Sequence, residues 1–346
     1  MGGHAIKDAV RLSAVDYHAI CKSLSTLLHD YKGRVIKAYK NKESFGDMDI
    51  LFPSALDALR FQKALITFYG YAIKQVVKNG PVTSIGVELP QGVFQMDLIV
   101  VPNVKWAAAY FDLNDLGNLM GRIAHKLGFK YGHDGLWYVL RDPDNHDYVI
   151  EELLVTSSLS EAFHLMGYSY GKYLTTEFNT LEYIFLYVID NPYFDPDIYL
   201  LDNRNHIQRV RDRKRHTYMQ FLAYCSSKQL SRKNIWTPEY KQRAREEKME
   251  EAFTLCPAFK ERYDTALKEH SLNKQMKLFW NGDNVSTWTG LTGKQLGQFM
   301  AYFKDSLNKM EPTHFRQWVL TPFADEYSID TIKRVAKEWR AKNGNC

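Results

Sequence analysis

The sequence predicts an α+β protein with a mixed sheet and flanking helices in its amino-terminal third, followed by an all-α carboxyl-terminal domain. Runs rich in β-branched residues, which are typical of strands, occur before residue 158 and are rare after it. Apolar residues at helical spacing recur along the whole chain and dominate its carboxyl-terminal half. With 346 residues, 45% of them hydrophobic, the chain can bury more than one core.

The first third alternates between helix and strand patterns. Helices are expected at 8–32 and 55–70, and strands at 34–39, within 43–54, at 83–89 and at 93–102. Gly33 and Gly70 mark the ends of the two helices, because glycine commonly follows the last helical residue. The turn-like Pro90-Gln91-Gly92 predicts that the last two strands form a hairpin.

The remainder of the chain is expected to be mainly helical. A helix is expected at 114–129, a strand at 136–142 and a turn at 143–148. Further helices are expected at 159–168, 179–189, 206–225, 238–253, 293–307 and 328–342. Since strand patterns nearly vanish in this half, its helices are expected to pack on one another.

Composition limits the partners and the cellular location. Charged residues make up 25% of the chain, with both signs mixed and a net charge of +5, which permits a polyanionic partner without requiring one. The four cysteines are far apart and lack the spacing of a zinc site or a disulfide framework, which favours a reducing compartment. No window reaches the roughly 18 consecutive apolar residues of a membrane span. We therefore expect a cytoplasmic protein without a membrane partner; the oligomeric state stays open.

Residues 43–54 place two carboxylates one residue apart in a predicted strand. In a strand, residues i and i+2 project from the same face, so Asp47 and Asp49 point together. Asp97 is a lone acid in the apolar strand at 93–102 and could join them. Carboxylate oxygens suit Mg²⁺, and two metal ions held by three acids would activate an attacking hydroxyl and neutralise a leaving pyrophosphate. The alternative is a surface turn at Gly46 with solvated acids.

The acidic segment, Glu-Ser-Phe-Gly-Asp-Met-Asp-Ile-Leu-Phe-Pro-Ser, resembles the palm signature of the X-family DNA polymerases, typified by DNA polymerase β, within the nucleotidyltransferase superfamily. The order helix, strand, Gly-Asp-x-Asp, helix and third-acid strand is also similar. The resemblance implies a polymerase β-like palm in which Asp47, Asp49 and Asp97 are catalytic and bind two Mg²⁺ ions, with Mn²⁺ as a substitute. It also implies that Asp97 polarises the acceptor hydroxyl.

A second part of the resemblance lies downstream, in residues 108–137. It is similar to the thumb entry of the family and implies a nucleotide site formed by Tyr110, Phe111, Asp115, Asn118 and Arg122. On a helix, the last three of these share one polar stripe. An ordinary solvated helix face explains the same stripe.

The sequence departs from the family just before the acidic motif. Members usually carry a Gly-Ser and an Arg pair there to hold the triphosphate, whereas this chain offers only lysines. The expected nucleotide-binding residues are Lys37, Lys40, Lys42, Ser44 and Gly46. Solvated lysines beside a strand are the alternative for each of them.

Two further positions differ from the family. Asp112-Leu113-Asn114 replaces the tight Gly-Ser turn after the aromatic pair, and Gln95 replaces a common Arg two residues before the third acid. These changes bear on nucleotide selectivity more than on the metal site.

Basic residues with interleaved aromatic residues occupy positions 204–248, a combination suited to phosphates and bases. The expected nucleic-acid-binding residues are Arg211, Arg213, Lys214, Arg215, Arg232 and Lys233, together with Lys294 after the glycine-rich turn at 290–293. A solvated helix surface and a plain inter-helix turn are the alternatives.

The resemblance and the patterns together predict three regions: an amino-terminal helix plus palm at 1–105, a thumb-like segment at 106–172 and a helical, basic domain at 173–346. The predicted function is metal-dependent transfer of a nucleoside monophosphate from an NTP or dNTP to a hydroxyl, most naturally the 3′-OH of DNA or RNA. The alternatives are 3′-end addition to tRNA or other RNA, nucleotidylation of a protein or small molecule, and a non-catalytic nucleic-acid-binding protein with a decayed palm.

Overall fold

The structure of the protein is a computed structural model that describes all residues except 1–4, 231–235, 310, 312, 322–325 and 344–346. The chain divides into two compact units, residues 1–260 and residues 261–346. The division falls within one helix, α12 (Pro257–Phe279). The boundaries expected after residues 105 and 172 therefore do not coincide with the division into compact units.

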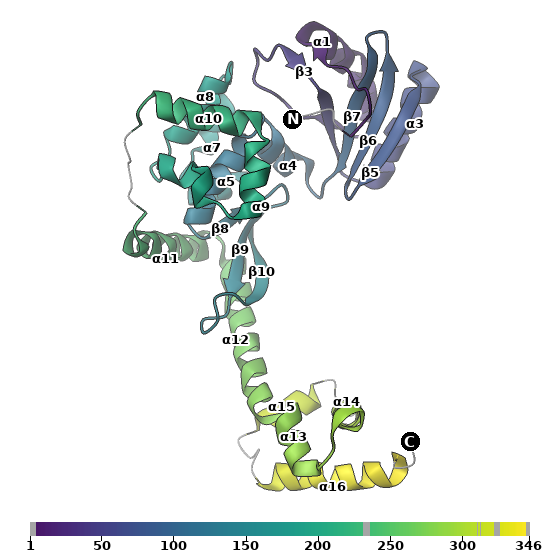
Figure 1. Cartoon of the computed structure of the whole chain (residues 1–346), viewed down its shortest axis with the longest axis vertical. Helices are drawn as coiled ribbons and strands as arrows, with labels where there is room; N and C mark the ends of the chain where they lie inside the picture. Colours follow the sequence, from purple (N-terminus) through teal and green to yellow (C-terminus); the bar gives the residue numbers. More distant parts are fainter. Residues whose placement is uncertain (1–4, 231–235, 310, 312, 322–325, 344–346) are drawn as a thin grey trace. The chain divides into compact units, whose positions relative to one another are not determined.

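A five-stranded mixed sheet forms the centre of the amino-terminal part of the first unit (Figure 1). Its order is β2-β4-β7-β6-β5, and only the pair β4–β7 is parallel. The strands are β2 (Arg34–Val35), β4 (Asp47–Phe52), β5 (Ile73–Asn79), β6 (Val82–Leu89) and β7 (Gly92–Val100). The hairpin β6–β7 and the mixed sheet of an α+β fold are thus as predicted.

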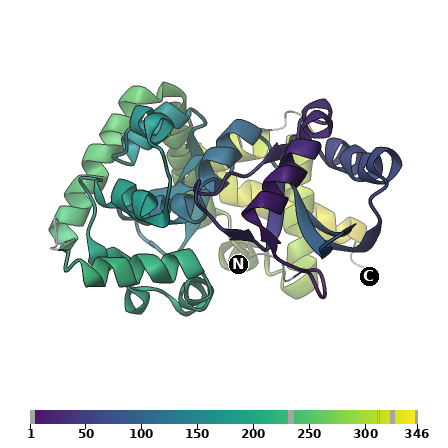
Figure 2. The same ribbon diagram turned by 90° about the horizontal axis from the view of Figure 1, so that it is seen from above.

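Three helices pack on one face of this sheet: α1 (Ala14–Ser23), α2 (Ser25–Asp30) and α3 (Ala55–Tyr69) (Figures 1 and 2). The side chain of Ser54 caps the start of α3, and Gly70, in a left-handed conformation with φ 66°, ends it. Met48 and Ile50 of β4 join the core beneath these helices. Because strand residues alternate between faces, Asp47 and Asp49 lie on the opposite face.

That opposite face is covered at its far end by α4 (Val104–Phe111), whose alanines pack against Leu51 and Ile99. The chain continues into α5 (Leu116–Lys126) and a three-stranded antiparallel sheet of β8 (Phe129–Tyr131), β9 (Leu136–Arg141) and β10 (Val149–Thr156). A small pair, β1 (Leu12–Ser13) with β3 (Ser44–Phe45), lies just before β4.

Helices complete the first unit, and no strand follows Thr156 among the residues described. They are α6 (Leu159–Leu165), α7 (Tyr170–Thr175), α8 (Leu181–Ile189), α9 (His206–Arg213), α10 (His216–Ser227) and α11 (Pro238–Leu255), with 3₁₀ turns at Pro196–Tyr199 and Leu201–Asn203. The single helix expected at 206–225 was wrong. Arg215 is extended (φ −91°, ψ 105°) and separates α9 from α10.

The expected strand at 34–39 was also too long. After the amide of Ile36 donates to the Asp49 carbonyl, the chain leaves the sheet, because Lys37 instead bonds to Asp112 and Leu113 beyond α4. The strand β5 was missed because its apolar residues, Ile73, Val76 and Val77, do not recur at every second position, although the burial of the strand alternates.

The second unit is helical. It comprises the rest of α12 with α13 (Gly282–Thr289), α14 (Gly293–Asn308), α15 (His314–Leu320) and α16 (Glu326–Asn343). Its core contains Phe299, Phe303, Ile332 and Trp339. Gly290 ends α13 in a left-handed conformation with φ 65°, which explains the turn before α14.

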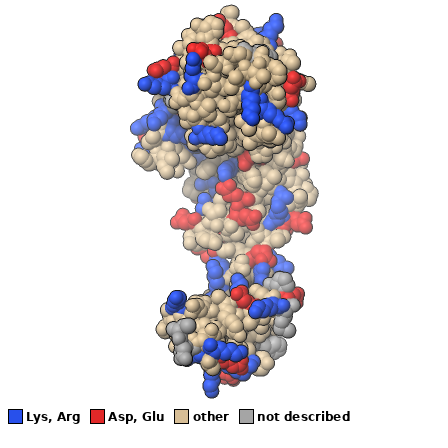
Figure 3. Space-filling view, turned by 90° about the vertical axis from the view of Figure 1, so that its right-hand side faces the viewer, with Lys and Arg blue, Asp and Glu red and all other residues tan. Residues whose placement is uncertain are grey.

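The surface carries charges of both signs, as the mixed blue and red side chains on the face in Figure 3 illustrate. None of the helices in the described part of the chain combines the length and the apolar character needed to cross a membrane.

Candidate active site

Three carboxylates converge where the two parallel strands run side by side. Asp47 and Asp49 come from β4 and Asp97 from β7, and the parallel register places Asp49 directly beside Asp97. One carboxylate oxygen from each of the three lies within 4.8 Å of the others. We call Asp47, Asp49 and Asp97 the acid triad.

The carboxylates of the acid triad repel one another. Burial and the neighbouring charges of Asp47 and Asp97 raise the pKa of Asp49 to about 7, while Lys42 acts in the opposite direction. Burial also lowers the pKa of Lys42 itself. Three hard oxygen donors in this state fit a divalent cation such as Mg²⁺, which would relieve their repulsion.

Gln95 fixes the orientation of Asp97. Its side-chain amide nitrogen donates to both carboxylate oxygens of Asp97 at 2.9 and 3.0 Å, and Gln95 is only 2% exposed. Its amide oxygen accepts from the backbone amides of Ala5 and Ile6, each at 3.0 Å. The amino-terminal segment is thereby tied to the residue that holds the third acid.

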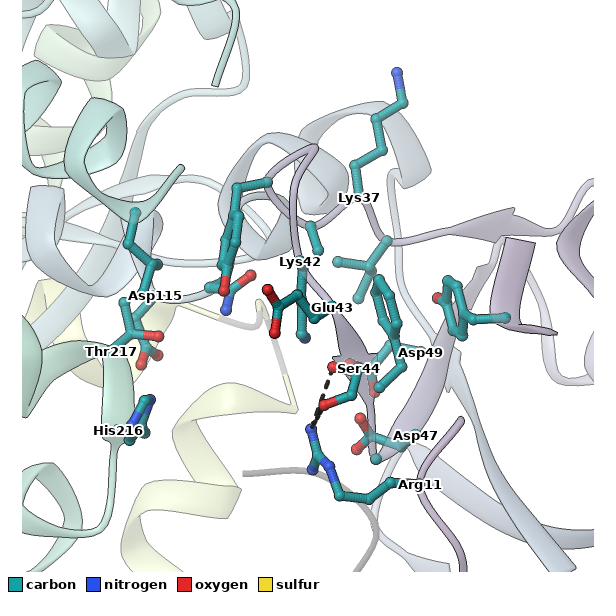
Figure 4. Close-up of a pocket in the computed structure, with 18 of the residues that line it drawn as sticks. Arg11, Lys37, Lys42, Glu43, Ser44, Asp47, Asp49, Asp115, His216 and Thr217 are labelled. Carbon is teal, nitrogen blue, oxygen red and sulfur yellow. Dashed lines mark hydrogen bonds between the residues drawn. The ribbon is translucent and has the colours of Figure 1, made fainter. Parts of the chain in front are cut away.

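Asp47 and Asp49 line a cleft of about 990 Å³, large enough for a nucleotide-sized ligand, and Asp97 lies beside Asp49 without lining it. The lining of the cleft comes from the strand β4, the segment before it and the helical part of the first unit. The polar and charged residues that line it are Arg11, Lys37, Asn41, Lys42, Glu43, Ser44, Asp47, Asp49, Asn114, Asp115, His216 and Thr217. In Figure 4, Asp115, His216 and Thr217 lie on one side of the cleft and Asp47 and Asp49 on the other.

The basic wall of the cleft is a loop, residues 36–43, fixed by backbone hydrogen bonds. At its start, the Lys37 amide donates to the Asp112 carboxylate at 2.9 Å, and the Lys37 carbonyl accepts from Leu113 at 2.6 Å. Further along, the amides of Lys40 and Asn41 donate to the carbonyls of residues 178 and 179, both at 2.9 Å. Lys37 and Lys42 both line the cleft from this well-anchored backbone, but the Lys37 side chain extends away from Asp47 and Asp49 (Figure 4).

Ser44 contributes to the same wall. The Arg11 guanidinium donates to the Ser44 hydroxyl at 3.0 Å and to its carbonyl at 3.2 Å (Figure 4). Lys42 stands over the Phe45 ring, 4.6 Å from its centre. A guanidinium, a lysine and a hydroxyl thus lie beside the acids, where anionic oxygens of a ligand would need them.

The helical part of the first unit contains a second group of charges, which does not line the cleft and is centred on the fully buried carboxylate of Asp212. Arg122 donates to it at 2.9 Å, and Arg204 and Arg211 lie at 3.5 and 3.3 Å. We call Arg122, Arg204 and Arg211 with Asp212 the arginine cluster. Nearby, Arg215 forms an ion pair with Asp115.

The structure brings together only some of the residues that the sequence predicted for the nucleotide site. Lys37, Lys42, Ser44, Gly46, Phe111 and Asp115 line the cleft with Asp47 and Asp49. Lys40, Tyr110, Asn118 and Arg122 do not line it. Arg122 is 9% exposed and committed to Asp212, and its η2 nitrogen also contacts Asn118 at 3.4 Å, so packing explains this pair better than nucleotide contact does.

The residues predicted to bind nucleic acid are spread more widely. Arg211, Lys214 and Arg215 border a hollow next to the cleft, whereas Arg213 does not. Arg232 and Lys233 lie outside the described residues. Lys294 belongs to the second unit, at the start of α14.

Sequence reasoning missed several residues of the cleft: Arg11, Tyr17, Asn41, Glu43, Asn114, His216 and Thr217. Most of them meet the acids across long sequence separations, which no local pattern reveals. One local signal existed at the turn after α4, where Leu113 and Asn114 both adopt left-handed backbones with φ 63° and 62°. Such strain in residues other than glycine often accompanies functional sites.

Comparison with known proteins adds no assignment: no family model matches the chain, and no curated protein matches it significantly in sequence. The chemistry of the site is therefore judged from its own arrangement. Clustered carboxylates next to cationic side chains in one cleft are suited to binding a metal ion together with a phosphorylated ligand.

Proposed function

We propose that the protein is a metal-dependent nucleotidyltransferase with a polymerase β-like palm. The observation that carries this proposal is the convergence of Asp47, Asp49 and Asp97, from parallel neighbouring strands, at a cleft that also holds Lys37 and Lys42. Metal ions between the acids would sit beside cations suited to the phosphates of an NTP or dNTP.

Each residue of the site has a defined role in this proposal. The acid triad would hold two Mg²⁺ ions, which supply charge neutralisation for the phosphates and activation of the acceptor hydroxyl. Lys42 and Arg11 bind the polyphosphate beside the acids. Asp97, oriented by Gln95, accepts the proton of the acceptor hydroxyl.

The transfer itself breaks one bond and forms one. The acceptor oxygen attacks the α-phosphorus, a new P–O bond forms, and the bond to the leaving pyrophosphate breaks. The product is the acceptor carrying a nucleoside monophosphate. Because the acids need not change oxidation state or bond to the nucleotide, the protein contributes positioning and charge.

A labelling assay tests this proposal. The protein is incubated with Mg²⁺ or Mn²⁺, each labelled NTP or dNTP, and DNA, RNA, tRNA, protein or small-molecule acceptors. We expect label transfer that EDTA abolishes and that Asp47→Asn/Asp49→Asn reduces at least ~10³-fold, because removing metal ligands removes most of the transition-state stabilisation.

The control is Asp30→Asn, which removes an exposed carboxylate on α2. This variant should transfer label as the parent protein does. If no acceptor gains label, or if the double variant is as active as the parent, the chain is a binding protein without this catalysis.

A further inference from the structure

A second hollow adjoins the cleft on its helical side. It has a volume of about 520 Å³ and is lined by Asp115, Ile207, Val210, Arg211, Lys214 and Arg215. Asp115 lines both the hollow and the cleft, so the two spaces meet at this residue. A ligand in the hollow could therefore extend to the acid triad without leaving the protein surface.

One face of α9 forms most of this hollow. Ile207, Val210, Arg211 and Lys214 follow the spacing i, i+3, i+4 and i+7, which places them on the same side of the helix. Ile207 is 79% and Val210 is 40% exposed, an unusual degree of exposure for aliphatic side chains. The face thus combines an open apolar surface with two cations.

Positive charges outnumber negative charges around the hollow. The arginine cluster sets three guanidiniums against the single carboxylate of Asp212, and Arg215 is paired with Asp115. Lys214 adds a further cation in the hollow. Deep in the cluster, the Arg204 side chain is 8% exposed and its η2 nitrogen has no hydrogen-bond partner among the described residues. Such an excess of positive charge favours an anionic ligand.

From this arrangement we infer that the acceptor is single-stranded nucleic acid, held in the hollow by α9, with Arg211 and Lys214 on its phosphates and Ile207 and Val210 against a sugar or base. That the bound nucleic acid is the acceptor rests on the proposed function. Its binding in the hollow does not. A polyanion with a flat apolar base for each phosphate matches a face on which exposed Ile207 and Val210 lie next to Arg211 and Lys214.

The geometry separates this ligand from the nucleotide. The polyphosphate of a bound NTP belongs with the acids and Lys42, on the wall formed by β4 and the loop before it. The hollow lies beyond Asp115, on the wall that faces Asp47 and Asp49 in Figure 4. A strand crossing from α9 past Asp115 could present its terminal hydroxyl to the nucleotide from the side opposite the pyrophosphate.

Binding is tested without catalysis. Fluorescence anisotropy is measured with a labelled 12-nucleotide oligo(dT) or oligo(U) and the Asp47→Asn/Asp49→Asn protein in EDTA. Each of Lys214→Gln and Arg211→Gln in this background should weaken binding about 3- to 10-fold. The slope of the logarithm of the association constant against the logarithm of the salt concentration should fall in magnitude by ~0.7 for each phosphate that the variant no longer neutralises. Unfolding of the variant would not produce this change.

The matched control is Arg213→Gln in the same background. Arg213 is an exposed cation one residue from Lys214 but outside the hollow, so its variant should bind within about twofold of the parent. Lys214→Gln is the cleaner of the two test variants, because Arg211 also contacts Asp212. Thermal unfolding of all variants shows whether each is folded.

The outcomes separate this inference from the proposed function. Oligonucleotide binding that depends on Lys214, in a protein that transfers no label, would uphold the inference and reject the function. Label transfer to nucleic acid with binding unchanged in Lys214→Gln and Arg211→Gln would reject the inference and leave the function standing. Equal, Lys214-dependent binding of poly-glutamate would also reject it, because the hollow would then accept an acidic protein.

Discussion

The acid triad and the arginine cluster are opposite solutions to burying charge in one unit of the protein. In the acid triad, three carboxylates share a small space, and Lys42 is one of the cations that act on Asp49. In the arginine cluster, one fully buried carboxylate has three guanidiniums around it. The first arrangement has surplus negative charge and the second has surplus positive charge.

The two groups differ in whether their charges attract or repel one another. Asp212 has attractive partners within the chain, so its pairs hold α5 to the segments around α9. The acid triad is held together against its own repulsion by the register of β4 and β7. Sites kept in an unfavourable state by the rest of the fold are typical of function.

The largest expected effect comes from breaking the arginine cluster. Asp212→Ala leaves the buried Arg122 and Arg204 without their carboxylate and should lower the free energy of unfolding by about 3 to 5 kcal/mol. Urea denaturation measures the change. Asp202→Ala, which removes an exposed carboxylate in the nearby 3₁₀ turn, should cost less than ~0.5 kcal/mol. Equal stability of both variants would contradict a structural role for Asp212.

A smaller effect is expected at the link between the acid triad and the amino-terminal segment. Gln95→Leu removes the donors to Asp97 and leaves the amides of Ala5 and Ile6 unpaired, which should cost about 2 kcal/mol of stability. Label transfer should also fall about 10- to 100-fold, because Asp97 loses its orientation.

The matched control for this variant is Gln75→Leu. Gln75 is half-buried and accepts from the Lys7 amide of the same segment in an exposed hydrogen bond, and it does not touch the acids. Activity that drops equally in both variants would mean that Gln95 acts only by holding the amino-terminal segment.

Removing a charge from the acid triad should stabilise the protein, whereas Asp212→Ala and Gln95→Leu should destabilise it. In EDTA at pH 8, Asp49→Asn should raise the free energy of unfolding by about 1 to 3 kcal/mol, because the native pKa of about 7 means that the ionised Asp49 is destabilising there. At pH 5 native Asp49 is protonated but the unfolded carboxyl is still mostly ionised, so the gain should shrink to roughly a third, and it should disappear only below about pH 4. Chemical denaturation at the two pH values measures it, and a variant less stable at pH 8 would refute the idea of stored repulsion.

The smallest effect distinguishes two lysines of one loop. Lys42→Gln should raise the KM for the nucleotide about 5- to 10-fold, near 1 kcal/mol, because Lys42 lines the cleft beside Asp47 and Asp49. Lys40→Gln should change KM less than about twofold, since Lys40 is exposed and does not line the cleft. Steady-state kinetics of label transfer compares them; equal shifts would mean that only the net charge of the loop matters.

Much of the fold could be predicted from the sequence because its signals are local. The helix α3 carries its own cap at Ser54 and stop at Gly70, and the hairpin β6–β7 has its turn between two apolar runs. The separation of α9 from α10 could not be predicted, since it depends on Arg215 reaching Asp115, 100 residues earlier. The spacing of apolar residues alone predicts one continuous helix across this break.

The candidate site divides in the same way. Asp47 and Asp49 were found from strand alternation and Asp97 from its isolation among apolar residues, and the parallel register brings the three together. His216 and Thr217 were missed because they meet the acids only after α10 folds back toward the sheet. The role of Arg122 was misjudged for a similar reason, as Asp212 lies 90 residues away.

The loop at 36–43 has a mechanical consequence. Although it leads into β4, its amides at Lys40 and Asn41 are bonded to carbonyls at 178 and 179, just before α8. A rotation of the helical part would carry Lys37 and Lys42 with it and shear them past the sheet-borne acids. In the proposed function, such a rotation would change the distance between Lys42, which is proposed to bind phosphate, and the acids proposed to bind metal, without any strand of the sheet having to bend.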